Sequence, residues 1–309
     1  MISRDWRNVL GHMMKLSENE IPACLGPRPV ARTPEWKAPS GSWDMQFHVL
    51  GPPARYPYAP TRHYTPPPAA LENYMELAGV LGIGHAVVVH ANTQGPDNDI
   101  YLEAIARCPE MLIGVIQCAS HFSLEQARNM QRAGVRGVRF AFNPQHGGIF
   151  DAAAIQSAAL IIREMNWYLQ LHMSAEDLVR LEPFIASLPC RVVIDHFGRI
   201  DTGFGMDQPA FQTLLRLAQH SQVWVKLSGA DRISRLEDWC DVDVYAHALA
   251  DVAIDRLVWG SDWPHTGYFR ASDMPDDIAL FNALGRWFVD SSSRRAILVD
   301  NPRRLAGLS

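Results

Sequence analysis

The chain of 309 residues lacks several features that would assign it to a class at once. It has no apolar run of about 18 residues, so no membrane-spanning helix is expected, and its first residues lack the apolar core of a secretory signal. Its five cysteines form no Cys-x-x-Cys pair, which favours reduced thiols in a cytoplasmic protein. A formal net charge of −5 leaves no basic excess that would indicate nucleic acid or an anionic membrane as a partner.

What is present is enough apolar material for a large core, since 48% of the residues are hydrophobic. Residues 1–40 differ from the rest. A short amphipathic helix is predicted over Asp5–Leu16, and five prolines between Pro22 and Pro39 then prevent regular structure. We expect an N-terminal extension over 1–40, lying over the surface or reaching a partner subunit in a homo-oligomer. Residues 41–309 are expected to form one domain, the catalytic one if the chain is an enzyme.

From Gly41 onward, eight runs rich in β-branched and aromatic residues predict strands. They are Trp43–Leu50, His85–Ala91, Leu112–Cys118, Gly137–Phe142, Trp167–Met173, Arg191–Phe197, Val223–Gly229 and Arg256–Ser261. Helical patterns lie between them: Pro68–Leu81, Asn98–Ala106, Leu124–Ala133, Ala152–Met165, Ala175–Ser187, Gln208–Gln219 and Trp239–Ala253. This alternation predicts parallel strands joined by crossover helices. Eight units close an α/β barrel of the TIM (β/α)8 type, whereas an open nucleotide-binding sheet would carry a Gly-x-Gly-x-x-Gly motif that is absent after the first run.

The first connection, Gly51 to Pro67, is long and rich in proline, with tyrosines and arginines between the prolines. Long loops at the carboxyl ends of barrel strands usually serve the active site. A proline-stiffened loop that presents tyrosine and arginine suits an anionic small molecule.

Polar side chains stand where the predicted strands end, and such positions carry the catalytic groups of a parallel barrel. Alternation puts Asp44, Gln46 and His48 on one face of the first strand, and Asp195 is expected to point toward the helices. The other candidates are His172, His196 and Asp262, with Arg139, Arg199 and Arg232 as arginines suited to bind carboxylates through paired hydrogen bonds.

Together these segments resemble the amidohydrolase superfamily, in its lactonase branch typified by the 2-pyrone-4,6-dicarboxylate lactonases. The resemblance covers roughly residues 41 to 306. It is carried by Gln46-Phe47-His48, Tyr56-Pro57-Tyr58-Ala59-Pro60 with Tyr64, Gly134-Val135-Arg136-Gly137-Val138-Arg139-Phe140, His172, Asp195-His196-Phe197-Gly198-Arg199, Gly260-Ser261-Asp262-Trp263-Pro264-His265, Met274-Pro275-Asp276-Asp277 and Val299-Asp300-Asn301-Pro302. It implies a hydrolase that opens a small carboxylated lactone in the breakdown of aromatic compounds or sugar acids.

One departure from the superfamily concerns metal. Its first strand usually carries His-x-His, two metal ligands, but here Gln46 stands in the first of these positions. A Gln carbonyl is a poor zinc ligand beside imidazole, and the lactonase branch hydrolyses its substrate without a metal. No cofactor is therefore expected. The alternative is one divalent ion such as zinc, held by His48, His172 and Asp262.

A second departure concerns the substrate. Tyr64, Arg139, Arg199 and Arg232 match positions that contact the dicarboxylate in the resembling lactonases. The second arginine expected soon after the fourth strand is absent, and Gln145 with His146 occupies that stretch, while His172 replaces an expected Tyr. The resemblance therefore implies a pocket for one carboxylate, or for a more neutral lactone.

In the reaction we predict, Asp262 is the general base that takes a proton from the attacking water. His196 and His48, with Gln46 or His172, donate hydrogen bonds to the developing oxyanion, and the arginines anchor the substrate. Three alternatives stay open. They are a lactone isomerase acting on sugar acids, a metal-dependent hydrolase or decarboxylase on the same scaffold, and a non-catalytic protein that binds a small molecule.

Overall fold

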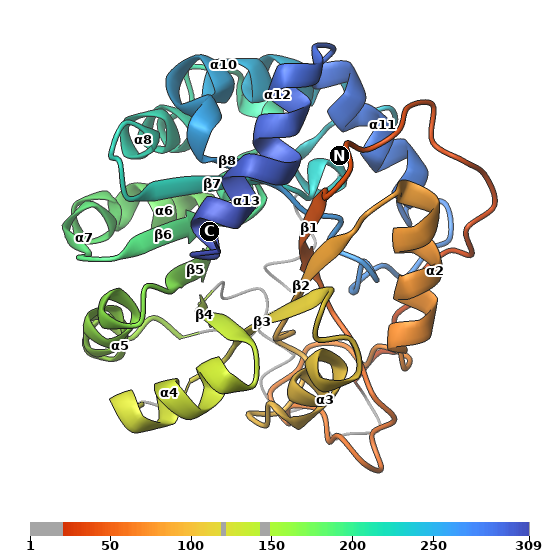
Figure 1. Cartoon of the computed structure of the whole chain (residues 1–309). Coiled ribbons are helices and arrows are strands. Elements are labelled where there is room, and N and C mark those ends of the chain that lie inside the picture. The colour runs from red at the N-terminus through yellow and green to blue at the C-terminus, as the bar shows by residue number, and fades with distance from the viewer. Residues whose placement is uncertain (1–20, 119–121, 143–148, 309) are drawn as a thin grey trace.

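A computed structural model describes residues 21–118, 122–142 and 149–308. Eight strands form one parallel sheet in the order of the chain, with a ring of helices outside it (Figure 1). The strands are β1 (Trp43–Phe47), β2 (His85–Val89), β3 (Leu112–Ile116), β4 (Val135–Ala141), β5 (Tyr168–His172), β6 (Arg191–Ile194), β7 (Val223–Leu227) and β8 (Leu257–Trp259). The predicted (β/α)8 barrel is confirmed, although most strands are shorter than the apolar runs that predicted them.

The barrel closes through the segment that follows β8. Phe47 pairs with Trp263 as an isolated parallel bridge. The amide of His48 donates to the carbonyl of Trp263 at 2.8 Å, and the amide of Asp262 donates to the carbonyl of Gln46 at 2.9 Å. The end of the first strand and the Asp-Trp-Pro-His segment are therefore neighbours, although more than 200 residues separate them in the chain.

The longer helices between and after the strands are α2 (Leu71–Leu81), α3 (Asp99–Arg107), α4 (Leu124–Arg132), α5 (Ala152–Glu164), α8 (Pro209–Ala218), α10 (Asp243–Ala253) and α11 (Asp277–Trp287). The shorter ones are α6 (Ala175–Arg180), α7 (Glu182–Ser187), α9 (Ala230–Ile233), α12 (Ser291–Arg295) and α13 (Asn301–Leu305). The prediction of one helix over Ala175–Ser187 was wrong, because Pro183, at the start of α7, has no N–H to continue the hydrogen bonding of α6. The predicted helix over Asp5–Leu16 lies outside the described residues.

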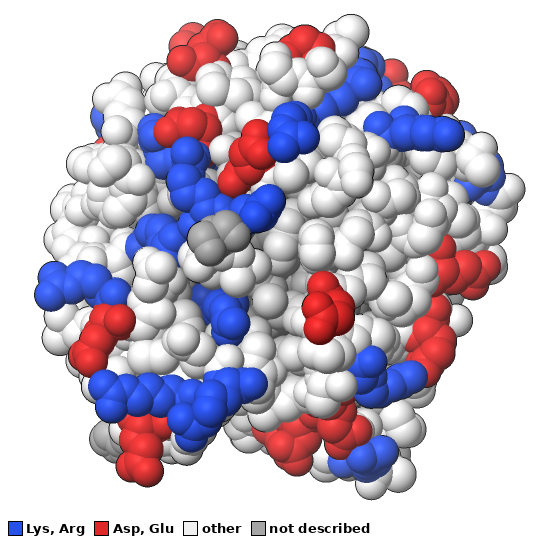
Figure 2. Space-filling model, in the orientation of Figure 1, with Lys and Arg blue, Asp and Glu red and all other residues white. Residues whose placement is uncertain are grey.

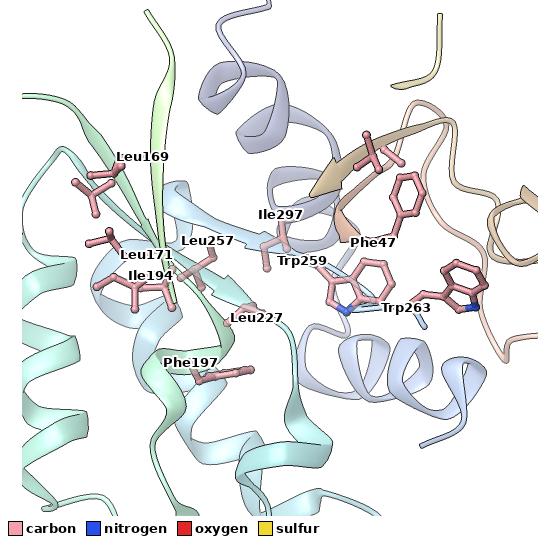
Figure 3. Close-up of a cluster of buried hydrophobic side chains, with 14 of the residues drawn as sticks. Phe47, Leu169, Leu171, Ile194, Phe197, Leu227, Leu257, Trp259, Trp263 and Ile297 are labelled. Atoms are coloured by element: carbon pink, nitrogen blue, oxygen red, sulfur yellow. The ribbon is translucent and has the colours of Figure 1, made fainter. Parts of the chain in front are cut away.

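Two apolar layers hold the barrel together. The outer layer packs the outward faces of the strands against the helices, as Phe47, Leu171 and Trp259 do in Figure 3. The inner layer fills the barrel itself with side chains such as Met45 and Trp224. The C-terminal helix α13 lies across one end of the barrel (Figure 1), and Leu305 joins the inner layer there. That end is closed by packing, which leaves the opposite end, at the carboxyl ends of the strands, for the site.

The face predicted for Asp44 was wrong. Its carboxylate accepts from the hydroxyl of Tyr74 on α2 at 3.0 Å, so it lies outside the barrel, while Met45 and Gln46 both lie inside. The pairing register between β1 and β2 shifts between Asp44 and Phe47, and such a bulge places two consecutive side chains on one face. This irregularity turns Gln46 and His48 inward together.

The described part of the extension, residues 21–40, runs along the loops near the site. The amide of Cys24 donates to the carbonyl of Thr65 at 3.0 Å, and that of Leu25 donates to the carbonyl of Tyr268 at 2.7 Å. Further along, the ring of Trp36 stacks on Phe281 of α11 with 4.2 Å between ring centroids. Residues 21–40 therefore lie over the surface of their own chain, beside the first loop and the segment after β8.

Acidic and basic side chains are interspersed over the face of the molecule that Figure 2 shows. Arg256 and Arg304, for example, both lie within 4.0 Å of Asp255. None of the described helices has the length and apolarity needed to cross a membrane. All five cysteines are unpaired.

Candidate active site

A pocket with about 380 Å³ of empty space opens at the carboxyl ends of the strands. Eight of the nine predicted site residues line it. The lining residues are His48, Tyr64, Ala91, Asn92, Arg139, His172, His196, Arg199, Arg232, Asp262 and Thr266. Gln46, the ninth, lies directly beneath the pocket and contacts Asp262. Residues at or after the ends of seven strands, together with Tyr64 of the first loop, therefore converge on one small space. Gln145 and His146 lie outside the described residues.

Asp262 stands at the centre of the hydrogen-bonding groups. Its Oδ1 accepts from the Gln46 amide at 3.0 Å and lies 3.4 Å from Nε2 of His48 and 3.9 Å from Nε2 of His196. Its Oδ2 accepts from Nε of Arg232 at 3.1 Å. The backbone at Asp262 has a φ of 63°, a left-handed conformation that is uncommon outside glycine and typical of functional sites.

The surroundings of Asp262 keep its carboxylate ionised. Burial alone would raise its pKa, but the Arg232 guanidinium and the imidazoles of His196 and His48 hold the pKa well below its ordinary value. A general base must be ionised to accept a proton, and Asp262 is ionised and lines the pocket, although its lowered pKa makes it a weaker base than a carboxylate with a pKa near the operating pH.

The imidazole of His48 has a defined orientation. Its Nδ1 lies 2.7 Å from the carbonyl of Val89, and because a carbonyl only accepts, Nδ1 carries a proton. Nε2 therefore faces Asp262, and His48 donates to the pocket only as an imidazolium. Burial lowers the pKa of the second imidazole, His196, to about 4, so this ring is neutral at pH 7. Its Nδ1 forms a hydrogen bond with the hydroxyl of Ser228 at 2.8 Å.

His172 and three arginines complete the wall. The ring of His172 packs edge-on against His196, with centroids 5.2 Å apart. Arg139 donates to the carbonyl of His90 at 2.9 Å. Desolvation, reinforced by the charge of Arg232, lowers the pKa of Arg199 to about 10, which still leaves a cation at neutral pH. The pocket is thus built for a ligand that carries negative charge.

Asp195 does not point toward the helices, and that prediction was wrong. Its carboxylate is inside the barrel, 3.0 Å from Nζ of Lys226 and 3.4 Å from Nη2 of Arg139, and it accepts from Gln170 at 2.9 Å. Two buried cations outweigh the outward preference that an acidic side chain has at a strand end. The same two cations hold the pKa of Asp195 below its ordinary value against the opposing effect of burial.

Several residues that the sequence did not single out contribute to this region. Gln170 and Lys226 are fully buried beneath the pocket, and both donate to Gln46. Asn92 and Thr266 line the pocket. A signal was present, because Gln170 and Lys226 are polar residues in the middle of otherwise apolar strands, where a barrel interior is normally filled by branched apolar side chains.

The residues do not fit a metal ion well. The Gln46 atom that faces Asp262 is the amide nitrogen, which is a donor and not a ligand. Within the described residues, no group of three or more His, Cys, Asp or Glu is arranged to hold a metal. In the described part of the chain, the set His48, His172 and Asp262 is therefore not assembled as a coordination site.

A parallel barrel that brings an ionised Asp together with His and Arg at the carboxyl ends of its strands has the arrangement of an enzyme active site. The chain belongs to the amidohydrolase family, whose sequence model matches residues 43–308. It is 43% identical to a 4-sulfomuconolactone hydrolase of Rhizobium radiobacter, over 96% of this chain and all of the relative.

Two further relatives point the same way. The chain is 32% identical to a 2-pyrone-4,6-dicarboxylate hydrolase of Comamonas testosteroni, over 88% of this chain and 92% of the relative. A crystal structure of a probable 2-pyrone-4,6-dicarboxylic acid hydrolase from Acinetobacter baumannii, with citric acid bound, superimposes with a TM-score of 0.76 at 26% identity, over 87% of this chain and all of that one. The resemblance read from the motifs is confirmed.

Proposed function

We propose that the protein hydrolyses a small lactone bearing acidic groups, with Asp262 activating water and without a metal. The observation that carries this proposal is the convergence on Asp262 of a hydrogen-bond donor, two imidazoles and an arginine in a pocket that holds two further arginines. Relatives named for the hydrolysis of a sulfonated lactone and of a pyrone dicarboxylate support the same substrate class.

The substrate anion binds to the arginines at the mouth. Arg199 and Arg232 both line the pocket, and guanidinium groups bind carboxylate and sulfonate through paired, charge-assisted hydrogen bonds. Held in this way, the ring carbonyl lies within reach of a water beside Asp262, and the alignment itself lowers the barrier.

Asp262 then takes a proton from the water as the water oxygen attacks the carbonyl carbon. Negative charge develops on the carbonyl oxygen, and the amide of Gln46 and the imidazole of His196, whose Nε2 lies 3.5 Å from that amide, are placed to stabilise it. The ring C–O bond breaks when the intermediate collapses. The proton held by Asp262 passes to the departing ring oxygen, which restores the carboxylate.

The absence of a metal from this scheme is supported by the amide nitrogen of Gln46, which faces Asp262 where relatives of the wider superfamily place a ligand. A hydrogen-bond donor at that position stabilises negative charge on the carbonyl oxygen, as a metal acting as a Lewis acid would. We also place the enzyme in the cytoplasm, in the breakdown of aromatic compounds or sugar acids. Five unpaired cysteines support a reducing compartment.

The test is a screen of carboxylated and sulfonated lactones and pyrones, followed by the loss of ring absorbance and by NMR of the products. Each substrate is tested with and without a chelator, and metal content is measured on the same sample. Ring-opened acid formed at equal rates in both conditions is the expected result. An isomeric lactone as product, activity lost on chelation, or ligand binding without turnover of any compound would each refute a different part of the proposal.

A further inference from the structure

Beneath the pocket, the barrel is filled by a polar layer where apolar side chains are usual. Gln46 from β1, Gln170 from β5 and Lys226 from β7 are all buried, and they meet Asp195 after β6. Burying the Lys226 ammonium is costly, and its ion pair with Asp195 offsets that cost only in part. A layer of this kind contributes little to stability in comparison with packed apolar residues, so its value lies elsewhere.

The hydrogen bonds of the layer fix the direction of the Gln46 amide. A carboxylate only accepts, so the Gln170 atom 2.9 Å from Asp195 is its nitrogen. That same nitrogen lies 2.8 Å from Oε1 of Gln46. An ammonium only donates, and Nζ of Lys226 lies 2.6 Å from the same Oε1. Two donors therefore hold the oxygen of Gln46 downward and turn its nitrogen up toward Asp262.

The opposite orientation of the Gln46 amide would disrupt the hydrogen bonding of the site. With the amide turned over, Oε1 would take the place of the nitrogen that now lies 3.0 Å from Oδ1 of Asp262. Two acceptors would then face each other in a buried environment, where repulsion and unsatisfied groups are costly. The donor that the proposed mechanism assigns to the developing oxyanion would also be lost.

We propose that Lys226 and Gln170 are positioning residues for hydrolysis, which act through Gln46 by holding its amide nitrogen toward the reacting centre. The inference rests on the proposed function, because the effect is read in the turnover of a lactone. Both side chains donate to Gln46 and neither lines the pocket, so the rate should change and substrate binding should stay largely unchanged.

The test is a double-mutant cycle on the full chain, with kcat and KM measured on the lactone that the wild type turns over fastest. Since loss of an oxyanion-hole donor typically costs about 10²–10³ in kcat, we expect Lys226→Met to lower kcat by about 10- to 100-fold and to change KM by less than about threefold. Gln170→Met should give a smaller loss of the same kind. In a Gln46→Leu background, neither change should lower kcat further.

The matched control is Tyr168→Phe, which removes a buried hydroxyl two residues before Gln170 on the same strand. That hydroxyl has no hydrogen-bond partner among the described residues, and kcat should stay at the wild-type value. Circular dichroism and thermal melting identify variants that do not fold. If Lys226→Met does not fold, the comparison of Gln170→Met in the wild-type and Gln46→Leu backgrounds tests the inference.

Losses that multiply in the Gln46→Leu background, or wild-type kcat in folded Lys226→Met, would overturn the inference. Failure of the proposed function is separate, since it would appear as a wild-type protein that opens no lactone. Neutron crystal structures of the wild type and of Lys226→Met, in which amide nitrogen and oxygen can be told apart, supply a readout that needs no turnover. An unchanged Gln46 amide beside Asp262 in the variant would also overturn the inference.

Discussion

Replacing Asp262 by Asn removes the proposed base and keeps the size of the side chain. Positioned general bases typically contribute about 10²–10⁴ to the rate, which corresponds to about 3–5 kcal/mol of barrier. We expect kcat to fall by that factor in Asp262→Asn. The amide cannot accept a proton from water at neutral pH, and nothing else among the described residues that line the pocket is a carboxylate.

Substrate binding should not weaken in Asp262→Asn, in contrast to the fall in kcat. In the structure, the Arg232 guanidinium donates to Oδ2 of Asp262 at 3.1 Å, so the carboxylate competes with a substrate anion for this arginine. Loss of the charge at Asp262 frees Arg232, and a charge-assisted hydrogen bond is worth about 1.5–3 kcal/mol. KM should therefore stay unchanged or decrease, and binding of the ring-opened product, measured by calorimetry, should become no weaker.

The assay is steady-state turnover of the preferred lactone, with Asp201→Asn as a matched control. Asp201 also pairs with an arginine, Arg235, but it lies outside the pocket, so its variant should keep wild-type kcat. A kcat for Asp262→Asn within about tenfold of the wild type would refute the general-base role. A large increase in KM would refute the competition between Asp262 and the substrate for Arg232.

Three other outcomes are expected. Arg232→Met should raise KM for acidic lactones by about 10- to 100-fold, since it removes a charge-assisted contact, and an equal effect on an uncharged lactone would contradict an anion-binding role. Gln46→His should bind zinc more tightly than the wild type, as metal analysis after dialysis would reveal, and failure to bind would indicate that the polar layer and not Gln46 excludes the metal. Burial lowers the pKa of His90 from 6.5 to about 4, so between these pH values the unfolded chain binds more protons than the folded one, and the free energy of unfolding rises with pH by on the order of 3 kcal/mol. In His90→Gln, urea unfolding should show a smaller rise of the unfolding free energy over this pH range. An unchanged rise would contradict the assignment to His90.

Much of the fold follows from local pattern. Apolar runs of strand length alternate with amphipathic stretches, and eight such units have one common closed arrangement. The ends of the strands were less well predicted, because apolar residues continue past the hydrogen-bonded part of the strands. The break at Pro183 shows the reverse case, where a single residue without an N–H overrides a continuous helical pattern.

The site was predicted as a set of residue types at strand ends, and the structure brings that set together. What the sequence missed lies one layer below. Lys226 and Gln170 stand inside apolar strands, and no local rule says that their side chains meet around Gln46. Asp195 was misplaced for the same reason, since its partners Lys226 and Arg139 come from other strands.

The sequence by itself determined the class of fold and the position of the site at the carboxyl ends of the strands, and it predicted Asp262 as the base, because each of these depends on spacing along one strand or on a motif within it. Only the tertiary structure decided which way the site residues face. A bulge in β1 turned Asp44 outward and Gln46 inward, and contacts from β5 and β7 set the direction of the Gln46 amide. Orientation of this kind arises from contacts between distant strands, and those contacts exist only once the barrel has closed.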